Sequence, residues 1–481
     1  MMTDFAEWQD ISGSGVALEG ASYALVGREA DGGRALSVKG STTGFSAALA
    51  EASDAGVYPL TAENARALRS RLPWLNPVPL GLRTSAGFGD RLGVATPGHI
   101  AAVRGTGVAP IFAQQSVREN TRTGRTPQLV LDDAMWSVFA CGWRDPWGAD
   151  ADHLKQPADI PAFADAGYTF FTIDPGDHVD DAAEQDDLAT LRAKAGALDW
   201  ATLGSSLEDA RASYLRTFAL DSLTLTFDEQ ALLKALVKYG SAVAHTVRMA
   251  GQLQVSMAGR PFEMEISVDE TGTTTSLHEH LFIASELTRL RVPFVSLAPR
   301  FVGRFEKGVD YIGDLGELDA NIGGHAAIVR HFGSSYKLSL HTGSDKFGVY
   351  PIAMRHTGGR VHLKTAGTSY LEALRLMANV DPALFRRVLD FARERYETDR
   401  RTYHVSALLE RVPAIDVLGT SDLPALLDEF DARQVLHVTF GSVLDHFGAD
   451  LRQMLSAHAA EYTETVRRHF DRHLEAFKTR S

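Results

Sequence analysis

Cysteine is nearly absent from this sequence, which contains one, Cys141, in 481 residues. A single thiol cannot form a disulfide within the chain, and it excludes metal sites built from several cysteines. Low cysteine content is typical of proteins from a reducing compartment, so we expect a cytoplasmic location. Cys141 ends an apolar helical pattern, which favours a packing role over a nucleophilic one.

Long apolar runs and an excess of positive charge are also missing. No segment reaches the roughly 18 uninterrupted apolar residues that a membrane helix needs. The first seven residues lack the basic and apolar regions of a signal peptide. We therefore expect no membrane partner. The formal net charge of -13 argues against a nucleic-acid partner. It leaves room for an anionic small molecule, since a few basic side chains in a pocket suffice to bind one.

A strand-then-helix rhythm begins at Pro77. Eight short apolar runs are each followed by polar residues and then by a helical pattern. The runs cover 79–83, 109–113, 148–152, 168–173, 262–270, 294–298, 337–340 and 361–364. Eight such units predict an α/β fold, a (β/α)8 TIM-like barrel with its active face at the strand C-termini. A doubly wound open sheet is the alternative, but Gly87-x-Gly89-x-x-x-Gly93 lacks the spacing of its phosphate-binding turn.

The remaining segments predict additions to this barrel. Residues 1–76 alternate short apolar runs with glycine-rich turns, which predicts a small N-terminal α+β cap. The barrel domain is expected at 77–370. It includes a helical insertion at 176–258, where a lid or dimer surface is plausible. Residues 371–481 predict a mostly helical C-terminal extension that packs on the barrel or forms a homo-oligomer.

The fifth run has an unusual polar side. Its apolar residues share one parity, whereas Glu263, Glu265, Ser267 and Asp269 share the other. This alternation predicts a β-strand. Three carboxylates on one strand face favour a site that attracts a metal ion or a polyhydroxylated substrate, because an unpaired buried carboxylate is costly. An edge strand with a solvated face is the alternative.

Histidines and carboxylates also follow two other predicted strands. Asp152 and His153 come at the end of the third run, and His341 ends the seventh. Together with Glu265 they would converge on the barrel mouth, where such ligands suit a divalent ion such as Zn²⁺ or Mn²⁺. Asp152 and His153 have opposite parity. Both can point into the mouth only if the strand ends at Ala151, so one of them could instead lie behind the metal ligands and contact them.

A third metal ligand is expected from the loop after the sixth run. This loop, 300–310, is rich in both charges, and either Asp310 or Glu306 could complete a metal site. A salt-bridged surface loop is the alternative. For a substrate, Gln114 and Asp345 suit sugar hydroxyls. Lys364 and Arg300 could together neutralise a carboxylate.

Long stretches of the chain resemble the tagaturonate epimerase (tagaturonate/fructuronate epimerase) family. They are 112–116, 122–128, 148–155, 170–175, 265–271, 304–314 and 337–347. The resemblance covers nearly the whole chain, and it implies a metal-dependent barrel enzyme of hexuronate catabolism. It also implies metal binding at His153 and His341 and acid/base roles for Asp152 and Glu265. Asp310 is the predicted third ligand.

The chemistry of such an epimerase can be argued from its substrates. The two keto-acids differ at a hydroxyl-bearing carbon β to the ketone, so deprotonation at that carbon gains no enolate stabilisation. Breaking the adjacent C–C bond by retro-aldol cleavage does gain it, because a bound cation can stabilise the enediolate. The aldehyde then rotates and re-adds from its other face, with two acid/base groups flanking the carbon. Transient oxidation would need a nicotinamide cofactor, for which no fingerprint is present.

Two other functions fit the same pattern less well. A metal-dependent aldolase or isomerase acting on another sugar acid could use the same site. A non-catalytic sugar-acid sensor could use the same barrel, but it would not need paired acid/base groups.

Overall fold

A closed eight-stranded parallel barrel forms the centre of the molecule. The computed structural model describes residues 4–478 except 12, 31, 222, 416 and 417. In barrel order the strands are β7 Ser85–Phe88, β8 Ala109–Ser116, β9 Gly148–Leu154, β10 Phe170–Ile173, β13 Glu263–Ser267, β14 Ser296–Ala298, β15 Lys337–Leu340 and β16 Val361–Thr365. β16 pairs with β7 and closes the barrel. The predicted (β/α)8 TIM-like fold is confirmed.

The first barrel strand lies later than predicted. The run 79–83 forms no strand, and β7 begins at Ser85. Pro77 and Pro79 cannot donate hydrogen bonds to a neighbouring strand, which disfavours a ladder there. Instead, the backbone N–H groups of Leu80 and Gly81 donate to the Glu263 carboxylate at the N-terminal end of the barrel.

The same end of the barrel is closed by a buried lysine. The Lys337 ammonium donates to the carbonyls of Gly81 and Arg83 at 2.9 and 2.8 Å, and to Ser85 Oγ at 2.8 Å. Because alternate strand residues face inward, Lys337 and Ser339 of β15 and His341, which directly follows it, form a row through the barrel. The inward parity predicted for β15 is confirmed at both ends of this row.

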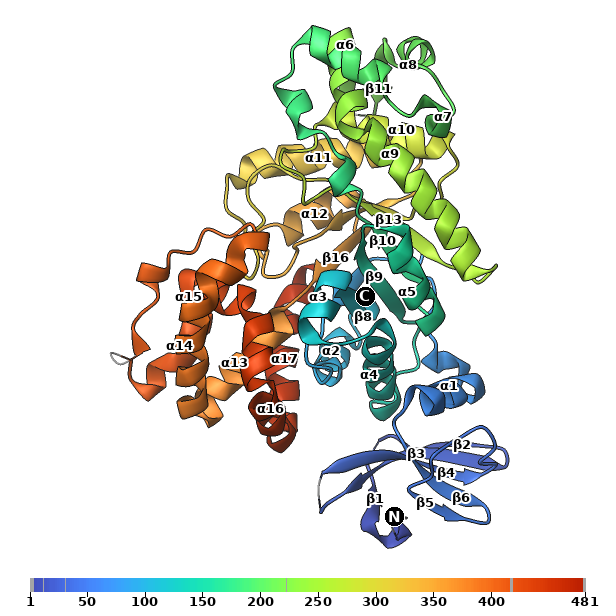
Figure 1. The fold of residues 1–481 in the computed structure, drawn as a ribbon, viewed down its shortest axis with the longest axis vertical. Coiled ribbons are helices and arrows are strands. Elements are labelled where there is room, and N and C mark those ends of the chain that lie inside the picture. The colour runs from blue at the N-terminus through green and yellow to red at the C-terminus, as the bar shows by residue number, and fades with distance from the viewer. Residues whose placement is uncertain (1–3, 12, 31, 222, 416–417, 479–481) are drawn as a thin grey trace.

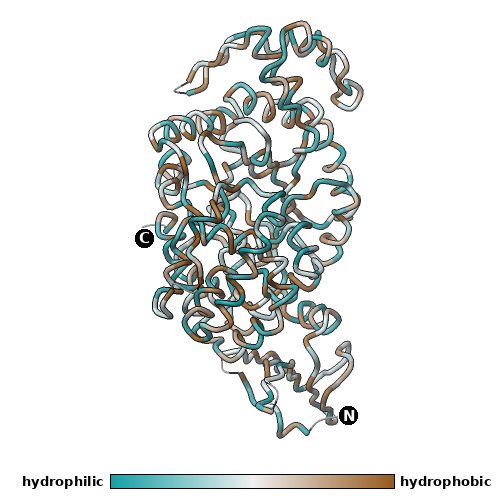
Figure 2. Tube along the Cα trace, turned by 60° about the vertical axis from the view of Figure 1, so that its left-hand side comes forward, coloured by the Kyte–Doolittle hydropathy of each residue, from teal (hydrophilic) through white to brown (hydrophobic). Residues whose placement is uncertain are grey.

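Helices surround the barrel, and several begin at a capping side chain. The helices are α2 Thr96–Val103, α3 Val117–Thr123, α4 Pro127–Ala140, α5 Ile160–Ala166, α10 Leu277–Arg289, α11 Leu315–His331, α12 Tyr350–Thr357 and α13 Thr368–Val380. Thr126 caps α4, with Pro127 in the first turn, and Ser116 and Ser276 form capping boxes. Figure 2 shows hydrophobic and hydrophilic residues alternating along these helices, as elements with one packed face require.

The segment after β10 is only partly an insertion. It contains α6 Leu188–Gly196, α7 Trp200–Leu203, α8 Leu207–Tyr214, the antiparallel pair β11 Thr217–Leu220 and β12 Leu223–Thr226, and the long helix α9 Glu229–Met257. α9 packs between α5 and α10, which is the place of the fourth helix of the barrel ring. The β11–β12 pair adds strand structure to a segment that was expected to be helical.

The N-terminal sheet and the C-terminal helices lie on different sides of the barrel (Figure 1). An antiparallel sheet of β1 Trp8–Asp10, β2 Val16–Leu18, β3 Ala21–Arg28, β4 Gly33–Gly40, β5 Ala50–Ala52 and β6 Ala55–Pro59, with α1 Ala62–Arg71, forms the N-terminal part. The C-terminal part contains α14 Pro382–Asp399, α15 Phe430–Val438, α16 Phe440–Ala457 and α17 Ala459–Leu474. α17 packs on α2 and α13. The helix α13 continues through residue 370, where the barrel domain was predicted to end. The predicted domain limits stay predictions. No helix in the described residues has the length and apolarity to span a membrane.

Candidate active site

A lysine in the middle of the barrel is surrounded by three carboxylates. Lys364 Nζ lies 2.7 Å from Asp150 Oδ2, 2.6 Å from Asp152 Oδ1 and 3.0 Å from Glu265 Oε1. All four side chains are buried. Burial alone would lower the pKa of Lys364, but the three carboxylates raise it above its ordinary value. One ammonium against three carboxylates leaves an excess of negative charge, which attracts a further cation.

Asp150 behaves differently from the other two carboxylates. Burial raises the pKa of its carboxyl above the ordinary range, although Lys364 opposes this shift. Burial would likewise raise the pKa of Glu265, but Lys364 and His341 hold it well below its ordinary value. Asp150 therefore binds a proton more readily than Glu265 does.

Two histidines face each other above this layer. His153 Nε2 lies 3.3 Å from His341 Nδ1. The remaining nitrogens contact carboxylates, His153 Nδ1 with Asp174 Oδ2 at 3.0 Å and His341 Nε2 with Glu265 Oε1. Two nitrogens bound at about 2.0–2.1 Å to one tetrahedral ion are separated by roughly 3.3 Å. A carboxylate on the far nitrogen is the usual way in which a protein orients a metal-binding imidazole.

The charges around the histidine pair favour a cation. Burial alone would lower the pKa of His153, but the carboxylates of Asp152, Glu270 and Asp174 raise it to about 10. Burial and Lys364 would lower the pKa of His341, which Asp269 and Glu265 raise above its ordinary value. The negative field that retains protons on both imidazoles also favours a metal ion, which competes with those protons.

Asp152 and His153 both enter the mouth although they are neighbours in sequence. β9 does not end at Ala151, as the parity argument required, but continues to Leu154. The pairing of β9 with β10 instead shifts register between Phe171 and Ile173, and His153 has φ +50°. This irregular backbone brings His153 to the same side as Asp152, so that ligand atoms of Asp152, His153 and His341 lie within 4.8 Å of one another.

Asp310, predicted as the third ligand, is not brought to this cluster. It is exposed, and its carboxylate accepts hydrogen bonds from the backbone N–H groups of Tyr311 at 2.7 Å and Gly348 at 3.4 Å. Glu306, the other candidate in the loop, turns toward the C-terminal extension and accepts from the Ser406 N–H and hydroxyl groups at 2.9 and 2.8 Å. Asp269 is closer to the cluster, because its Oδ1 lies 3.2 Å from His341 Nδ1.

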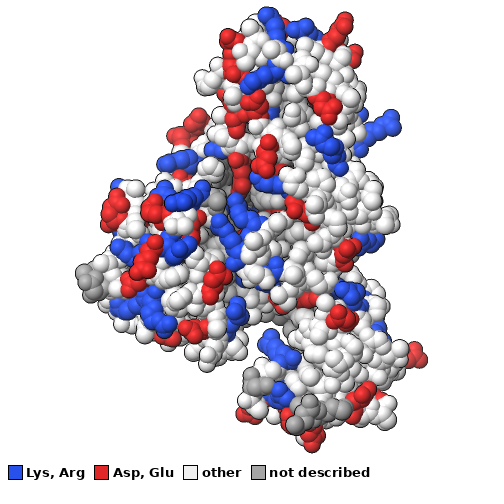
Figure 3. Space-filling model, in the orientation of Figure 1, with Lys and Arg blue, Asp and Glu red and all other residues white. Residues whose placement is uncertain are grey.

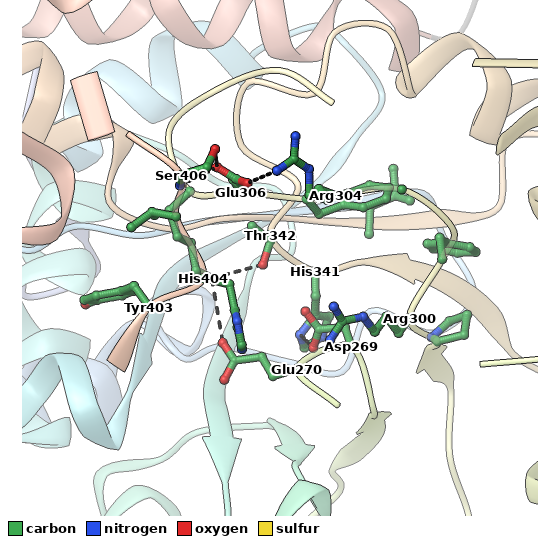
Figure 4. Close-up of a pocket in the computed structure, with 17 residues that line it drawn as sticks. Asp269, Glu270, Arg300, Arg304, Glu306, His341, Thr342, Tyr403, His404 and Ser406 are labelled. Atoms are coloured by element: carbon green, nitrogen blue, oxygen red, sulfur yellow. Dashed lines mark hydrogen bonds and ion pairs between the residues drawn. The ribbon is translucent and has the colours of Figure 1, made fainter. Parts of the chain in front are cut away.

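A cavity of about 350 Å³ opens beside the histidine pair (Figure 4). The loops after β13, β14 and β15 line it, and the segment Tyr403–Ser406 of the C-terminal extension forms a further wall. Arg300 lines this cavity, and its guanidinium group has no ion-pair partner in the described part of the chain. Figure 3 shows lysine and arginine side chains gathered beside a few acidic ones in the hollow at the centre of this face.

The other predicted substrate residues divide into two groups. Gln114 and Lys364 line a smaller pocket next to the cavity, together with Asp152, His153 and His341. Asp345 lines neither space. It has φ +60°, and its Oδ1 pairs with Arg433 of α15 at 3.0 Å. The left-handed backbone turns its side chain toward the C-terminal helices, and its role as a substrate ligand stays a prediction.

Several residues of the site were not predicted from the sequence. Asp150 shares the strand parity of Asp152, so alternation could have identified it. Asp174 directly follows β10, where polar residues were expected at the barrel mouth. Tyr403–Ser406 carry no local signal, because only the packing of the C-terminal extension brings them to the cavity.

Comparisons with known proteins identify the family to which this chain is similar. The family model of tagaturonate epimerases matches residues 23–477. A tagaturonate/fructuronate epimerase of Thermotoga maritima is 44% identical over 416 residues, which are 86% of this chain and 84% of the relative.

Solved structures show the same similarity over almost the whole fold. The glycerol-bound crystal structures of fructuronate-tagaturonate epimerase UxaE from Cohnella laeviribosi superpose with TM-scores of 0.91 for one glycerol and 0.92 for two. The identities are 35% and 34%. The matches cover 98% and 99% of this chain, and 97% and 98% of the solved chains. The chain belongs to the tagaturonate epimerase family.

Proposed function

We propose that this protein is a metal-dependent epimerase of hexuronate catabolism that interconverts D-tagaturonate and D-fructuronate. The observation that carries the proposal is the pair of imidazole nitrogens, His153 Nε2 and His341 Nδ1, facing each other at 3.3 Å in the barrel mouth. Membership of the tagaturonate epimerase family supports the substrate pair. The scarcity of cysteine supports a cytoplasmic location, and assembly into a homo-oligomer stays a prediction.

The donor set fits a divalent cation, zinc or manganese. His153 and His341 would each contribute one nitrogen. We assign the third position to Asp269, in place of Asp310, because its carboxylate has no lysine or arginine partner among the described residues. Asp152 Oδ1, by contrast, already bonds to Lys364 Nζ at 2.6 Å. When bound, the cation would supply Lewis-acid stabilisation of the negative charge that develops on the ketone side of the substrate.

Asp152 and Glu265 are the proposed acid/base pair. Retro-aldol cleavage transfers the proton of the β-hydroxyl to one carboxylate while the C–C bond breaks and an aldehyde forms. After the aldehyde rotates, the C–C bond re-forms on the opposite face, and the new alkoxide receives a proton from the other group. Asp152 lines the smaller pocket, whereas Glu265 lies below it against His341.

Lys364 would link the two members of this pair. Its ammonium contacts both carboxylates, at 2.6 Å from Asp152 and 3.0 Å from Glu265. A proton that Asp152 has taken can pass to Lys364 while Lys364 passes one of its own to Glu265. This exchange leaves the lysine charged and resets the pair for inversion in either direction.

Removal of metal tests the proposal. Chelation should abolish the conversion of tagaturonate to fructuronate, and add-back of Zn²⁺ or Mn²⁺ should restore it. His153→Ala and His341→Ala should each lose the bound metal and at least about 100-fold of kcat, since the structure offers few other ligands. His331→Ala, an exposed histidine of α11, is the matched control. Full activity and full metal content in both variants would contradict the proposal, and cleavage products without fructuronate would point to an aldolase.

The fate of a deuterium label tests the retro-aldol route. Tagaturonate carrying deuterium at the inverted carbon should give fructuronate that retains the label, because that carbon becomes an aldehyde without losing its hydrogen. Mass spectrometry of the product measures the retention. Substrate labelled at the carbon next to the ketone is the control for enolisation. Loss of deuterium from the inverted carbon to solvent would exclude the route.

Lys364→Met tests the central lysine against a matched variant, Lys238→Met. Lys238 is also buried and lies 3.0 Å from Glu184 and 3.2 Å from Glu279, away from the barrel mouth. Each substitution leaves buried carboxylates without a partner and should lower the free energy of unfolding by about 3–5 kcal/mol. Only Lys364→Met should also reduce kcat, by roughly 100-fold or more. Urea unfolding measures the change in stability, and steady-state kinetics measure kcat. Equal losses of kcat in both variants would contradict a catalytic role for Lys364.

A further inference from the structure

The smaller pocket is a narrow extension of the cavity beside the histidine pair. It measures about 30 Å³. His341, Thr342, Lys307 and Tyr403 line both spaces, so a molecule in the cavity can reach into it. Its inner walls come from Gln114 of β8 and from the segments that follow β7, β15 and β16, through Arg91, Ser344 and Ala366.

Several buried polar atoms around this pocket have no hydrogen-bond partner in the described structure. They are Arg91 Nη1, both amide atoms of Gln114 and Ser344 Oγ. The three residues are only 4%, 1% and 5% exposed. Nearly all buried polar atoms of folded proteins are paired, and each unpaired one costs about 1–3 kcal/mol. These atoms all lie on the walls of one pocket, which indicates that a bound ligand supplies their hydrogen-bond partners.

Contacts within the protein fix the Arg91 guanidinium group and leave one of its nitrogens, Nη1, without a hydrogen-bond partner. Its Nε and Nη2 lie 3.0 and 2.9 Å from Glu119 Oε1. Its guanidinium carbon lies 3.6 Å from the centre of the Phe440 ring. Gly367 makes room for it, since a Cβ there would lie 2.6 Å from the same guanidinium carbon. Arg91 Nη1 is therefore a fixed, charged donor with no partner of its own.

The size and donors of the pocket match a carboxylate. A volume of about 30 Å³ accommodates roughly two oxygen-sized atoms, too little for a whole six-carbon substrate. Guanidinium, amide and hydroxyl donors suit two acceptor oxygens with negative charge. TIM barrels often bind anionic groups at the loops after the last two strands, and Ser344 and Ala366 belong to those loops.

We propose that this pocket binds the carboxylate end of the hexuronate, with Arg91 Nη1 as its charged donor and Gln114 and Ser344 as neutral ones. The rest of the substrate then extends past His153 and His341 into the 350 Å³ cavity. The proposal rests on the proposed function for its substrate. Lys364, whose charge is matched by three carboxylates, is not the carboxylate ligand, and Arg300 contacts the opposite, hydroxyl-bearing end.

Equilibrium binding of a matched ligand pair tests this placement. D-galactonate and galactitol share their six-carbon chain and the hydroxyls on five of its carbons, and they differ at the remaining terminal carbon, which is a carboxylate in galactonate and a CH2OH group in galactitol. Calorimetry on the metal-loaded full chain should show that the wild type binds the aldonate at least about 10-fold more tightly. Arg91→Gln should reduce this preference to within about 3-fold and leave the affinity for galactitol nearly unchanged. Arg300→Gln, the control, should keep the preference.

Three results would overturn the proposal. They are a wild type without preference, an Arg91→Gln variant that keeps the wild-type preference, and a loss of preference in Arg300→Gln alone. If Arg91→Gln fails to fold, as judged by thermal unfolding, Gln114→Leu and Ser344→Ala serve instead. Each should reduce the preference by about 3-fold or more, and an unchanged preference in both would likewise overturn the proposal. Because binding needs no turnover, a chain that prefers the aldonate but does not epimerise tagaturonate would refute the proposed function while leaving this pocket intact.

Discussion

The ion cluster of Lys364 with Asp150, Asp152 and Glu265 is the interaction on which the rest of the site depends. These residues come from β16, β9 and β13, so only a closed barrel brings them within 3.0 Å of one ammonium. Such a cluster is stable in a buried place only when every charge is matched or hydrogen-bonded. The cluster has one lysine for three carboxylates. The remaining negative charge attracts a cation, which explains why the histidine pair above the cluster can serve as a cation site.

The barrel interior carries charged groups at both ends, which departs from the branched apolar filling usual in this architecture, although Ile111 and Phe170 form an apolar cluster within it. At the N-terminal end, Lys337 and Glu263 pair with backbone groups of the segment before β7. At the C-terminal end, His153 and His341 have carboxylates behind them. The lower layers pair their charged groups within the protein, whereas Arg91 at the mouth keeps one unpaired guanidinium nitrogen, next to the unpaired polar atoms of Gln114 and Ser344.

Local alternation in the sequence was enough to predict the strands that carry chemistry. Glu265 shares a parity with Glu263, and the structure places both inside the barrel, as the pattern at 262–270 predicts. The same reasoning predicted that His341 faces inward. It offered no way for both Asp152 and His153 to enter the mouth from a strand that continues past Ala151, because the left-handed backbone at His153 cannot be inferred from side-chain alternation.

Residues in loops could not be placed from the sequence. Asp310 and Glu306 have suitable side chains, but the path of their loop is set by contacts with Ser406, about a hundred residues away. Asp345 was expected at the substrate and lies instead against Arg433. For Glu306 and Asp345 the deciding contact comes from the C-terminal extension, whereas Asp310 is held by backbone groups of Tyr311 and Gly348. Its segment Tyr403–Ser406 also completes the cavity, so this extension is part of the site.

The most direct test of this account is the position of the metal ion. Crystals of the full chain loaded with Zn²⁺ or Mn²⁺ should give an anomalous scattering peak about 2.0–2.2 Å from both His153 Nε2 and His341 Nδ1, with the Asp269 carboxylate as a further ligand. A peak at the Asp345, His469 and His473 cluster with none at the histidine pair would contradict the account, as would the absence of any peak in the barrel mouth.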